Sequence, residues 1–230
     1  MIPYWTPSRR SVIQNLNGKE PRSVDFILVQ IAVRCIFRIY FRHRSFGTRH
    51  VPDDSGAVIA TNHASNLDPL LVNVDIPRPL FYMAKKSLHE IPLFGPLIRH
   101  FYAFPVRRGG ADRKAIRHAV DIIKAGNLLL MFPEGTRTRN GELQRPRRGI
   151  GKIVDDSGCP VVPGYLDGSF RAMKPGDWFP KPVHTSIRFG EPLNFAEDGE
   201  GQFDSRREGE QYIADEVMKA IKDIKLQNET

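Results

Sequence analysis

Short apolar runs alternate with stretches of helical periodicity from residue 50 onward. Runs of about four to eight apolar residues are typical of buried strands, and apolar residues three and four positions apart are typical of helices with one buried face. Strands are expected at residues 57–61, 81–84, 103–106, 128–132, 160–166 and 184–189, and helices at residues 69–76, 87–101, 112–125, 147–157 and 206–226. Because strands alternate with helices, the pattern predicts an α/β fold with a single mixed, largely parallel sheet flanked by helices.

Residues 23–44 combine many large apolar side chains with arginines at every fourth position, Arg34, Arg38 and Arg42. This spacing predicts an amphipathic helix with one basic face. Its longest uncharged stretch, residues 26–33, is far shorter than the roughly 20 apolar residues that a bilayer-spanning helix needs. We therefore expect an interfacial helix, with apolar side chains among the acyl chains and arginines near the lipid phosphates. A helix docked on its own domain is the alternative.

The positive charge of the chain is concentrated in its N-terminal part. The 230 residues carry a formal net charge of +8, and residues 1–50 hold nine Lys or Arg against two acids, or +7. A basic segment on a nearly neutral body suggests an anionic surface as partner, either phospholipid or nucleic acid. The length suits one domain with an appendage, which we divide into an arm and membrane-interface helix at 1–45 and a domain at 46–230.

The turn after the first expected strand carries the sequence Asn-His-Ala-Ser-Asn-Leu-Asp-Pro at residues 62–69. Pro69 suits the first helical position, which places Asp68 at the N-cap. A strand-turn-helix corner can fold the carboxylate of Asp68 back onto the imidazole of His63. A histidine oriented in this way can act as a general base toward an alcohol near neutral pH. The alternative is that Asp68 only caps a helix and His63 is only a turn residue.

A second polar cluster, Phe-Pro-Glu-Gly-Thr-Arg at residues 132–137, directly follows the apolar run 128–131. Glu134 supplies a carboxylate, Gly135 permits an unusual backbone angle or the close approach of a ligand, and Arg137 suits a phosphate. Further cations follow at Arg139, Arg145, Arg147, Arg148 and Lys152, and basic pairs end two other strands at Lys85-Lys86 and Arg107-Arg108. In a parallel sheet these strand ends lie along one edge, which predicts a site where His63 and phosphate-binding cations meet.

The order of these motifs resembles the glycerolipid acyltransferase family, which includes the lysophosphatidic acid acyltransferases. The His-x-x-x-x-Asp signature matches His63 and Asp68, the Phe-Pro-Glu-Gly-Thr-Arg block matches residues 132–137 without change, and a Val-Pro block matches residues 161–163. A second block that ends in an arginine matches residues 95–108, although Arg107 stands where the family usually has an acid. The resemblance covers about residues 46–190.

The resemblance implies acyl transfer from acyl-CoA or acyl carrier protein to the free hydroxyl of 1-acyl-sn-glycerol 3-phosphate, forming phosphatidic acid in phospholipid biosynthesis. His63 would be the catalytic base and Asp68 would orient it. Arg137 and Arg108 would bind the acceptor phosphate, while Glu134 and Gly135 would shape that pocket. Lys86 is a further candidate for substrate binding. No cofactor and no metal are implied.

Two alternatives stay open at this point. The acceptor could instead be glycerol 3-phosphate or a lyso-aminolipid, or the chain could be a non-catalytic phospholipid-binding protein. A nucleic-acid partner is not expected, because the basic residues lie at strand ends within the site motifs.

The cysteine content and the basic helix also bear on the location of the protein. Cys35 and Cys159 lack paired spacing and are expected to be buried free thiols, as in a reducing compartment. Together with the acyl transfer that the resemblance implies, this leads us to expect the protein at the cytoplasmic face of the inner membrane, as a monotopic or peripheral protein on an anionic surface.

Overall fold

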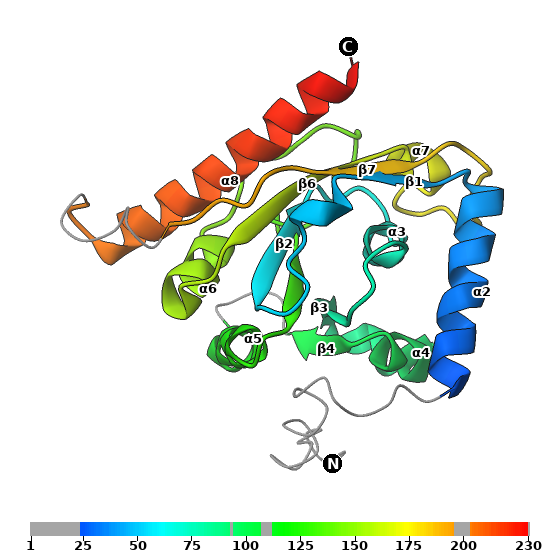
Figure 1. Cartoon of the computed structure of the whole chain (residues 1–230), viewed down its shortest axis with the longest axis horizontal. Helices are drawn as coiled ribbons and strands as arrows, with labels where there is room; N and C mark the ends of the chain where they lie inside the picture. Colours follow the sequence, from blue (N-terminus) through cyan, green and yellow to red (C-terminus); the bar gives the residue numbers. More distant parts are fainter. Residues whose placement is uncertain (1–23, 93, 107–111, 196–202, 230) are drawn as a thin grey trace.

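A seven-stranded sheet forms the middle of the molecule in the computed structural model, which describes residues 24–229 except 93, 107–111 and 196–202 (Figure 1). Its strands are β1 Arg44–Phe46, β2 Ala57–Thr61, β3 Leu80–Lys85, β4 Ala103–Val106, β5 Leu128–Met131, β6 Val161–Asp167 and β7 Ser186–Phe189, in the spatial order β1-β7-β6-β2-β5-β3-β4. Only β6 and β7 pair in antiparallel fashion among the described strands. The predicted mixed, largely parallel sheet is therefore confirmed.

The helices flank both faces of this sheet. They are α2 Val24–Tyr40, α3 Asp68–Asn73, α4 Phe94–His100, α5 Arg113–Lys124, α6 Gly149–Ser157, α7 Ser169–Ala172 and α8 Arg206–Glu229. The helix expected at 87–101 is divided into a 3-10 turn, Lys86–Leu88, and α4. Pro92 lies between them, and a proline removes a backbone donor and disfavours helix at the residue before it. Strand β1 and helix α7 were not predicted, because three or four residues carry no readable period.

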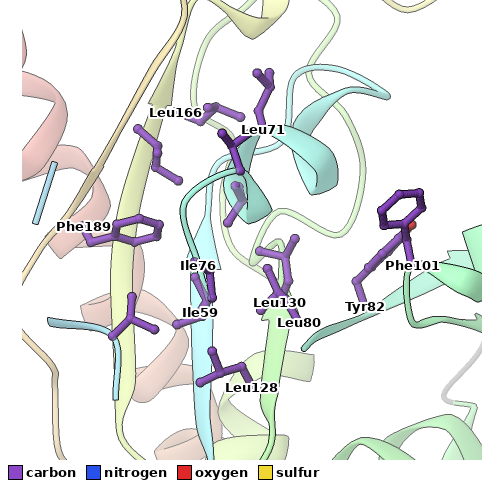
Figure 2. Packing of buried hydrophobic residues seen from close by; sticks show 14 of the residues in the cluster. Ile59, Leu71, Ile76, Leu80, Tyr82, Phe101, Leu128, Leu130, Leu166 and Phe189 are labelled. Atoms are coloured by element: carbon purple, nitrogen blue, oxygen red, sulfur yellow. The ribbon is translucent and has the colours of Figure 1, made fainter. Parts of the chain in front are cut away.

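The two faces of β2 belong to different layers of the core. Ala57 and Ile59 pack in the cluster that includes residues of α2, α3 and α4, which Figure 2 shows from close by. Val58 and Ala60 pack in the cluster that includes residues of α5, α6 and α8. Burial on both faces explains why the strand is apolar from Ala57 to Ala60, as expected for a central parallel strand, and Thr61 at its end is buried as well.

Helix α2 docks on the domain through its arginines as well as its aromatic residues. Phe37 and Phe41 are buried in the core. Arg34 Nε donates to the backbone oxygen of Val74 at 2.7 Å, and Arg38 pairs with Asp75 at 2.6 Å. Arg34, Arg38 and Phe37 thus take part in the docking of the helix on its own domain, which was the alternative expectation. Contact of α2 with a lipid surface stays a prediction.

The exposed side of α2 carries several apolar residues. Ile31, Ile36 and Ile39 are exposed. Cys35 of the same helix is also exposed, so the prediction that it is buried was wrong, whereas Cys159 is buried as expected. None of the helices within the described residues is long and apolar enough to cross a bilayer. The division of the chain at 45/46 stays a prediction, although the sheet already begins at Arg44.

The carboxyl ends of β2, β3, β5 and β6 lie at one edge of the sheet, because β2 pairs in parallel with β5 and β6, and β3 pairs in parallel with β5. The turn with His63 leaves β2 at this edge, and the turn that begins at Phe132 leaves β5 beside it. Lys86 follows β3 at the same edge. The fold thus brings together residues that are distant in the sequence.

Candidate active site

His63 and Asp68 form a hydrogen-bonded pair. Nδ1 of His63 lies 2.8 Å from Oδ2 of Asp68. The Asp68 side chain is fully buried, while the His63 side chain is 13 % exposed. A carboxylate can only accept hydrogen bonds, so Nδ1 carries the proton and Nε2 is left as an acceptor. The pair can therefore take up a proton at Nε2 and stabilise the imidazolium that results.

The carboxylate of Asp68 also fixes the backbone of the turn. Its Oδ2 accepts hydrogen bonds from the amides of Ala64 and Ser65 at 2.7 and 2.8 Å. Helix α3 begins at Asp68, after Leu67, and has no side-chain cap. The expected N-cap role of Asp68 is thus replaced by a role inside the turn, where one carboxylate oxygen holds both the imidazole and the backbone beside it.

Glu134 joins three segments of the site. Its Oε1 accepts from the His63 amide at 2.7 Å, and its Oε2 accepts from the backbone and side-chain nitrogens of Gln144 at 3.0 and 3.1 Å. Burial raises the pKa of Glu134 above its ordinary value, although these hydrogen bonds and nearby His63 act in the opposite direction. Glu134 is therefore a positioning residue that links the turns after β2 and β5.

The turn after β5 packs on His63 at two further points. The rings of His63 and Phe132 are stacked, with centroids 3.9 Å apart and planes 11° apart. The backbone oxygen of His63 accepts a hydrogen bond from the amide of Thr138 at 2.8 Å. With the Asp68 bond on one nitrogen and an aromatic ring on one face, few orientations remain for the imidazole.

Gly135 lies beneath the side chain of Arg147. Its φ of 69° is in the left-handed region, and a Cβ at this position would lie 2.7 Å from Cδ of Arg147. The amide of Arg147 donates to the backbone oxygen of Pro133 at 2.8 Å, which holds the arginine over the turn. The left-handed backbone conformation thus favours glycine here, and any Cβ would also displace the side chain of Arg147.

The cations expected at this edge have different surroundings. Arg137 and Arg147 take part in none of the ion pairs among the described residues. Lys86 lies 3.8 Å from Glu90, whereas Arg148 and Lys152 both lie near Glu210 of α8. Arg107 and Arg108 lie outside the described residues. Arg139 and Arg145 are likewise in none of these ion pairs and are exposed. Arg137 is half-buried directly after the Glu134 turn and Arg147 lies over Gly135, so these two are the candidates for an anionic ligand beside this turn.

Three structural roles in this site were not predicted. They belong to Phe132, Gln144 and Asn62, whose side chain pairs with both backbone groups of Leu166 at 2.8 and 3.0 Å. Asn62 and Phe132 are the first residues of the two motifs, which indicated that they lie near the site but not what they do there. Gln144 follows Glu134 by ten residues in a polar loop, and nothing in the sequence marked it.

Comparison with known proteins places this arrangement in a family. The family model Acyltransferase matches residues 42–167. The chain is 30 % identical over 167 residues to 1-acyl-sn-glycerol-3-phosphate acyltransferase from Bacillus subtilis (strain 168), covering 72 % of this chain and 81 % of that protein. It is 33 % identical over 141 residues to the protein of the same name from Limnanthes douglasii, covering 60 % of this chain but only half of that protein.

A solved structure has the same fold. It is the crystal structure of the 1-acyl-sn-glycerophosphate (LPA) acyltransferase PlsC from Thermotoga maritima, which matches with a TM-score of 0.68 and 21 % identity over 94 % of this chain and 88 % of that chain. The family model covers more than half of the chain and includes His63, Asp68 and residues 132–137. The chain therefore belongs to the acyltransferase family.

Proposed function

We propose that this protein transfers a fatty acyl group from acyl-CoA or acyl carrier protein to the free hydroxyl of 1-acyl-sn-glycerol 3-phosphate and so forms phosphatidic acid. The observation that carries the proposal is the 2.8 Å contact between His63 Nδ1 and Asp68 Oδ2. It leaves Nε2 free to act as a base at the strand-end edge, the edge of the sheet where β2, β3, β5 and β6 have their carboxyl ends. Relatives named 1-acyl-sn-glycerol-3-phosphate acyltransferase support this choice of acceptor.

His63 is the catalytic base in this mechanism. Its Nε2 takes the proton of the acceptor hydroxyl while the oxygen attacks the carbonyl carbon of the acyl thioester. A carbon–oxygen bond forms, the carbon–sulfur bond breaks, and the thiolate leaves with the proton that His63 had taken. Asp68 stabilises the imidazolium between these two proton transfers, as a carboxylate does beside other catalytic histidines. The acyl group passes directly between the substrates, without an acyl-enzyme.

The acceptor phosphate is proposed to bind at Arg137, with Arg108 as a second ligand and Lys86 as a further candidate. A guanidinium offers two parallel donors to phosphate oxygens, which adds direction to charge. Arg137 is half-buried directly after the Glu134 turn, and no ion pair with a described residue competes for it. Glu134 and Gly135 act on this pocket indirectly, since the first fixes the turn and the second leaves room for Arg147.

A lipid acceptor requires that the strand-end edge faces a membrane. We propose a peripheral or monotopic position at an anionic surface, on the cytoplasmic face of the inner membrane. Ile36 and Ile39 on the outer side of α2 are 57 % and 79 % exposed, and they are suited to the acyl-chain boundary of a bilayer. Because Arg34 and Arg38 bind the domain, α2 would contribute apolar contact more than charge.

A panel of acceptors and donors tests the function. Purified protein is supplied with lysophosphatidate, glycerol 3-phosphate or a lyso-aminolipid, together with acyl-CoA or acyl carrier protein, and product lipid and free thiol are measured. We expect equal amounts of phosphatidate and thiol with lysophosphatidate, and a loss of at least about 1,000-fold in His63→Ala. Tight lysophosphatidate binding without turnover by the wild type would instead indicate a binding protein.

A further inference from the structure

Two large aromatic residues are almost fully exposed in the loop between α7 and β7. Trp178 is 90 % exposed and Phe179 is 80 % exposed. Side chains of this size are rarely left so open to water without a partner. Between Lys174 and Lys181 the loop carries these two lysines against the single acid Asp177, whereas nearby Arg171 is paired with Asp167 at 3.1 Å. The loop thus combines an apolar tip with a basic rim.

The backbone of this loop is held by hydrogen bonds. The amide of Lys181 donates to the backbone oxygen of Ala172 at 2.7 Å, and the amide of Asp177 donates to that of Lys174 at 3.0 Å. Oδ2 of Asp177 accepts in return from the amide of Lys174 at 3.0 Å. Trp178 follows directly in this closed turn, so its exposure belongs to an ordered loop.

The loop lies at the same sheet edge as His63. Strand β6 runs parallel to β2 and ends at Asp167, and β7 returns antiparallel from Ser186, so residues 168–185 leave and re-enter the sheet at this edge. Strand β1 is parallel to β7, which brings the C-terminal end of α2 to the same edge. In Figure 1 the segment around α7 lies beside that end of α2.

A hydrogen bond connects the loop directly to α2. The hydroxyl of Tyr40 donates to the backbone oxygen of Pro180 at 2.9 Å. Ile39, the neighbour of Tyr40 in the chain, is also among the exposed apolar residues. The end of α2 and the aromatic loop therefore adjoin one another, and each carries exposed apolar side chains.

We propose that residues 176–182 form a membrane-insertion loop in which Trp178 and Phe179 enter the interface of an anionic bilayer. This inference rests on the proposed function, because a lipid acceptor places the strand-end edge against the membrane. Tryptophan is suited to the headgroup level of a bilayer, where one side of its ring is apolar and its N–H is hydrated. Lys174 and Lys181 complement anionic headgroups beside it. Together with Ile36 and Ile39 of α2, the loop gives the protein a second point of attachment.

Fluorescence of Trp178 tests the insertion without any acyl transfer. The chain has two tryptophans, so a Trp5→Phe background of the full-length protein leaves Trp178 as the single reporter. Vesicles of phosphatidylcholine and phosphatidylglycerol, with no lysophosphatidate, are added with and without brominated acyl chains. We expect a blue shift of the emission and quenching by the brominated lipid. Unchanged emission with vesicles that bind the protein would overturn the proposal.

A pair of double variants gives an independent measurement. Trp178→Ser with Phe179→Ser should weaken sedimentation with the same vesicles by about tenfold, because two apolar side chains leave the interface. The matched control is Tyr212→Ser with Leu226→Ser, which removes two exposed apolar side chains from α8. Equal sedimentation of the two variants would contradict the insertion loop. If the wild type were a dimer and the Trp178/Phe179 variant a monomer, the exposed aromatic residues would bind a second copy of the chain, which would also contradict the proposal.

Activity on a short-chain, water-soluble lysophosphatidate separates this inference from the proposed function. We expect the aromatic-loop variant to retain wild-type turnover on this substrate, since neither residue takes part in the contacts around His63. An inactive wild type whose Trp178 is still quenched by brominated lipid would refute the acyltransferase proposal and leave the insertion loop in place.

Discussion

The imidazole of His63 is stacked on Phe132, with ring centroids 3.9 Å apart and an interplanar angle of 11°. The contact joins the turn after β2 to the turn after β5, and it covers one face of the ring whose Nδ1 is bonded to Asp68. Aromatic contacts of this kind contribute about 0.5–1.5 kcal/mol beyond the area they bury. Phe132 is therefore a positioning residue for the proposed base.

Replacement of Phe132 should reduce turnover more than substrate binding. We expect Phe132→Leu to lower kcat by about tenfold, because the imidazole gains orientations that do not face the acceptor hydroxyl. Phe132→Tyr keeps the ring and should restore most of the rate. Steady-state kinetics with lysophosphatidate check both variants, and a raised KM with normal kcat in Phe132→Leu would place Phe132 at the substrate instead.

Arg137 should act on the acceptor. Loss of a charge-assisted phosphate contact costs about 1.5–3 kcal/mol, so Arg137→Ala should raise KM for lysophosphatidate by roughly 10- to 100-fold. KM for the acyl donor should change by less than about twofold. Arg139→Ala, an exposed arginine two residues further on, is the control. An effect confined to the donor would show that Arg137 binds the phosphates of the carrier.

A methyl group at Gly135 should disturb Arg147. Gly135→Ala places a Cβ 2.7 Å from Cδ of Arg147 and forces a non-glycine residue to a φ of 69°. The backbone alone costs about 1–2 kcal/mol, and we expect a higher acceptor KM from the displaced guanidinium. Gly149→Ala is the matched control, since a Cβ there meets no atom within 4 Å. Arg147→Ala should give the same rise in KM, and normal kinetics in that variant would exclude Arg147 from the site.

Parallel topology explains why so much of the site was predictable. Strands β2 and β5 are neighbours in the sheet, so the motifs that follow them must meet at one edge. His63 and Asp68 are only five residues apart in the sequence, so a single turn is enough to bring their side chains into contact. Local sequence and strand direction together determined these contacts.

Contacts that depend on a distant partner were not predictable in the same way. Arg38 is followed 37 residues later by Asp75, its partner in the ion pair, and the four-residue spacing of the arginines carries no information about an acid on another element. The same holds for Gln144, which reaches Glu134 through a loop without regular structure. The exposure of Trp178 and Phe179 was not predictable either, because adjacent aromatic residues in a proline-rich loop can equally well pack against the domain.

Buried His43 should make the protein less stable in mild acid. Burial lowers the pKa of His43 from 6.5 to about 4, a change that nearby Asp75 opposes and Arg38 reinforces. The unfolded chain therefore binds a proton at His43 between these pH values and the folded chain does not, so the free energy of unfolding falls as pH decreases from about 6.5 toward 4. Between about pH 7.5 and pH 5 we expect a loss of about 2 kcal/mol from this residue.

Urea unfolding at the two pH values measures this effect. Nδ1 of His43 lies 2.8 Å from Oγ1 of Thr185, and a glutamine can keep a hydrogen bond there, so His43→Gln should flatten the pH dependence. His184→Gln replaces an exposed histidine and should leave the dependence as in the wild type. If the free energy of unfolding changed equally between the two pH values in the wild type, His43→Gln and His184→Gln, the assignment to His43 would be contradicted.

The two sides of α2 should respond differently to substitution. Ile36→Ser with Ile39→Ser removes exposed apolar side chains and should weaken binding to anionic vesicles by about tenfold, with little dependence on salt. Arg34→Gln with Arg38→Gln removes contacts to Val74 and Asp75 and should instead speed amide hydrogen exchange in α2. Surface ion pairs contribute about 0–1 kcal/mol, so this second change should be modest. A different result is a salt-dependent loss of vesicle binding in the arginine variant, with unaltered amide exchange in α2. It would show that the arginines leave Asp75 and bind lipid phosphates at the membrane. The docked position of α2 would then be its state in water only.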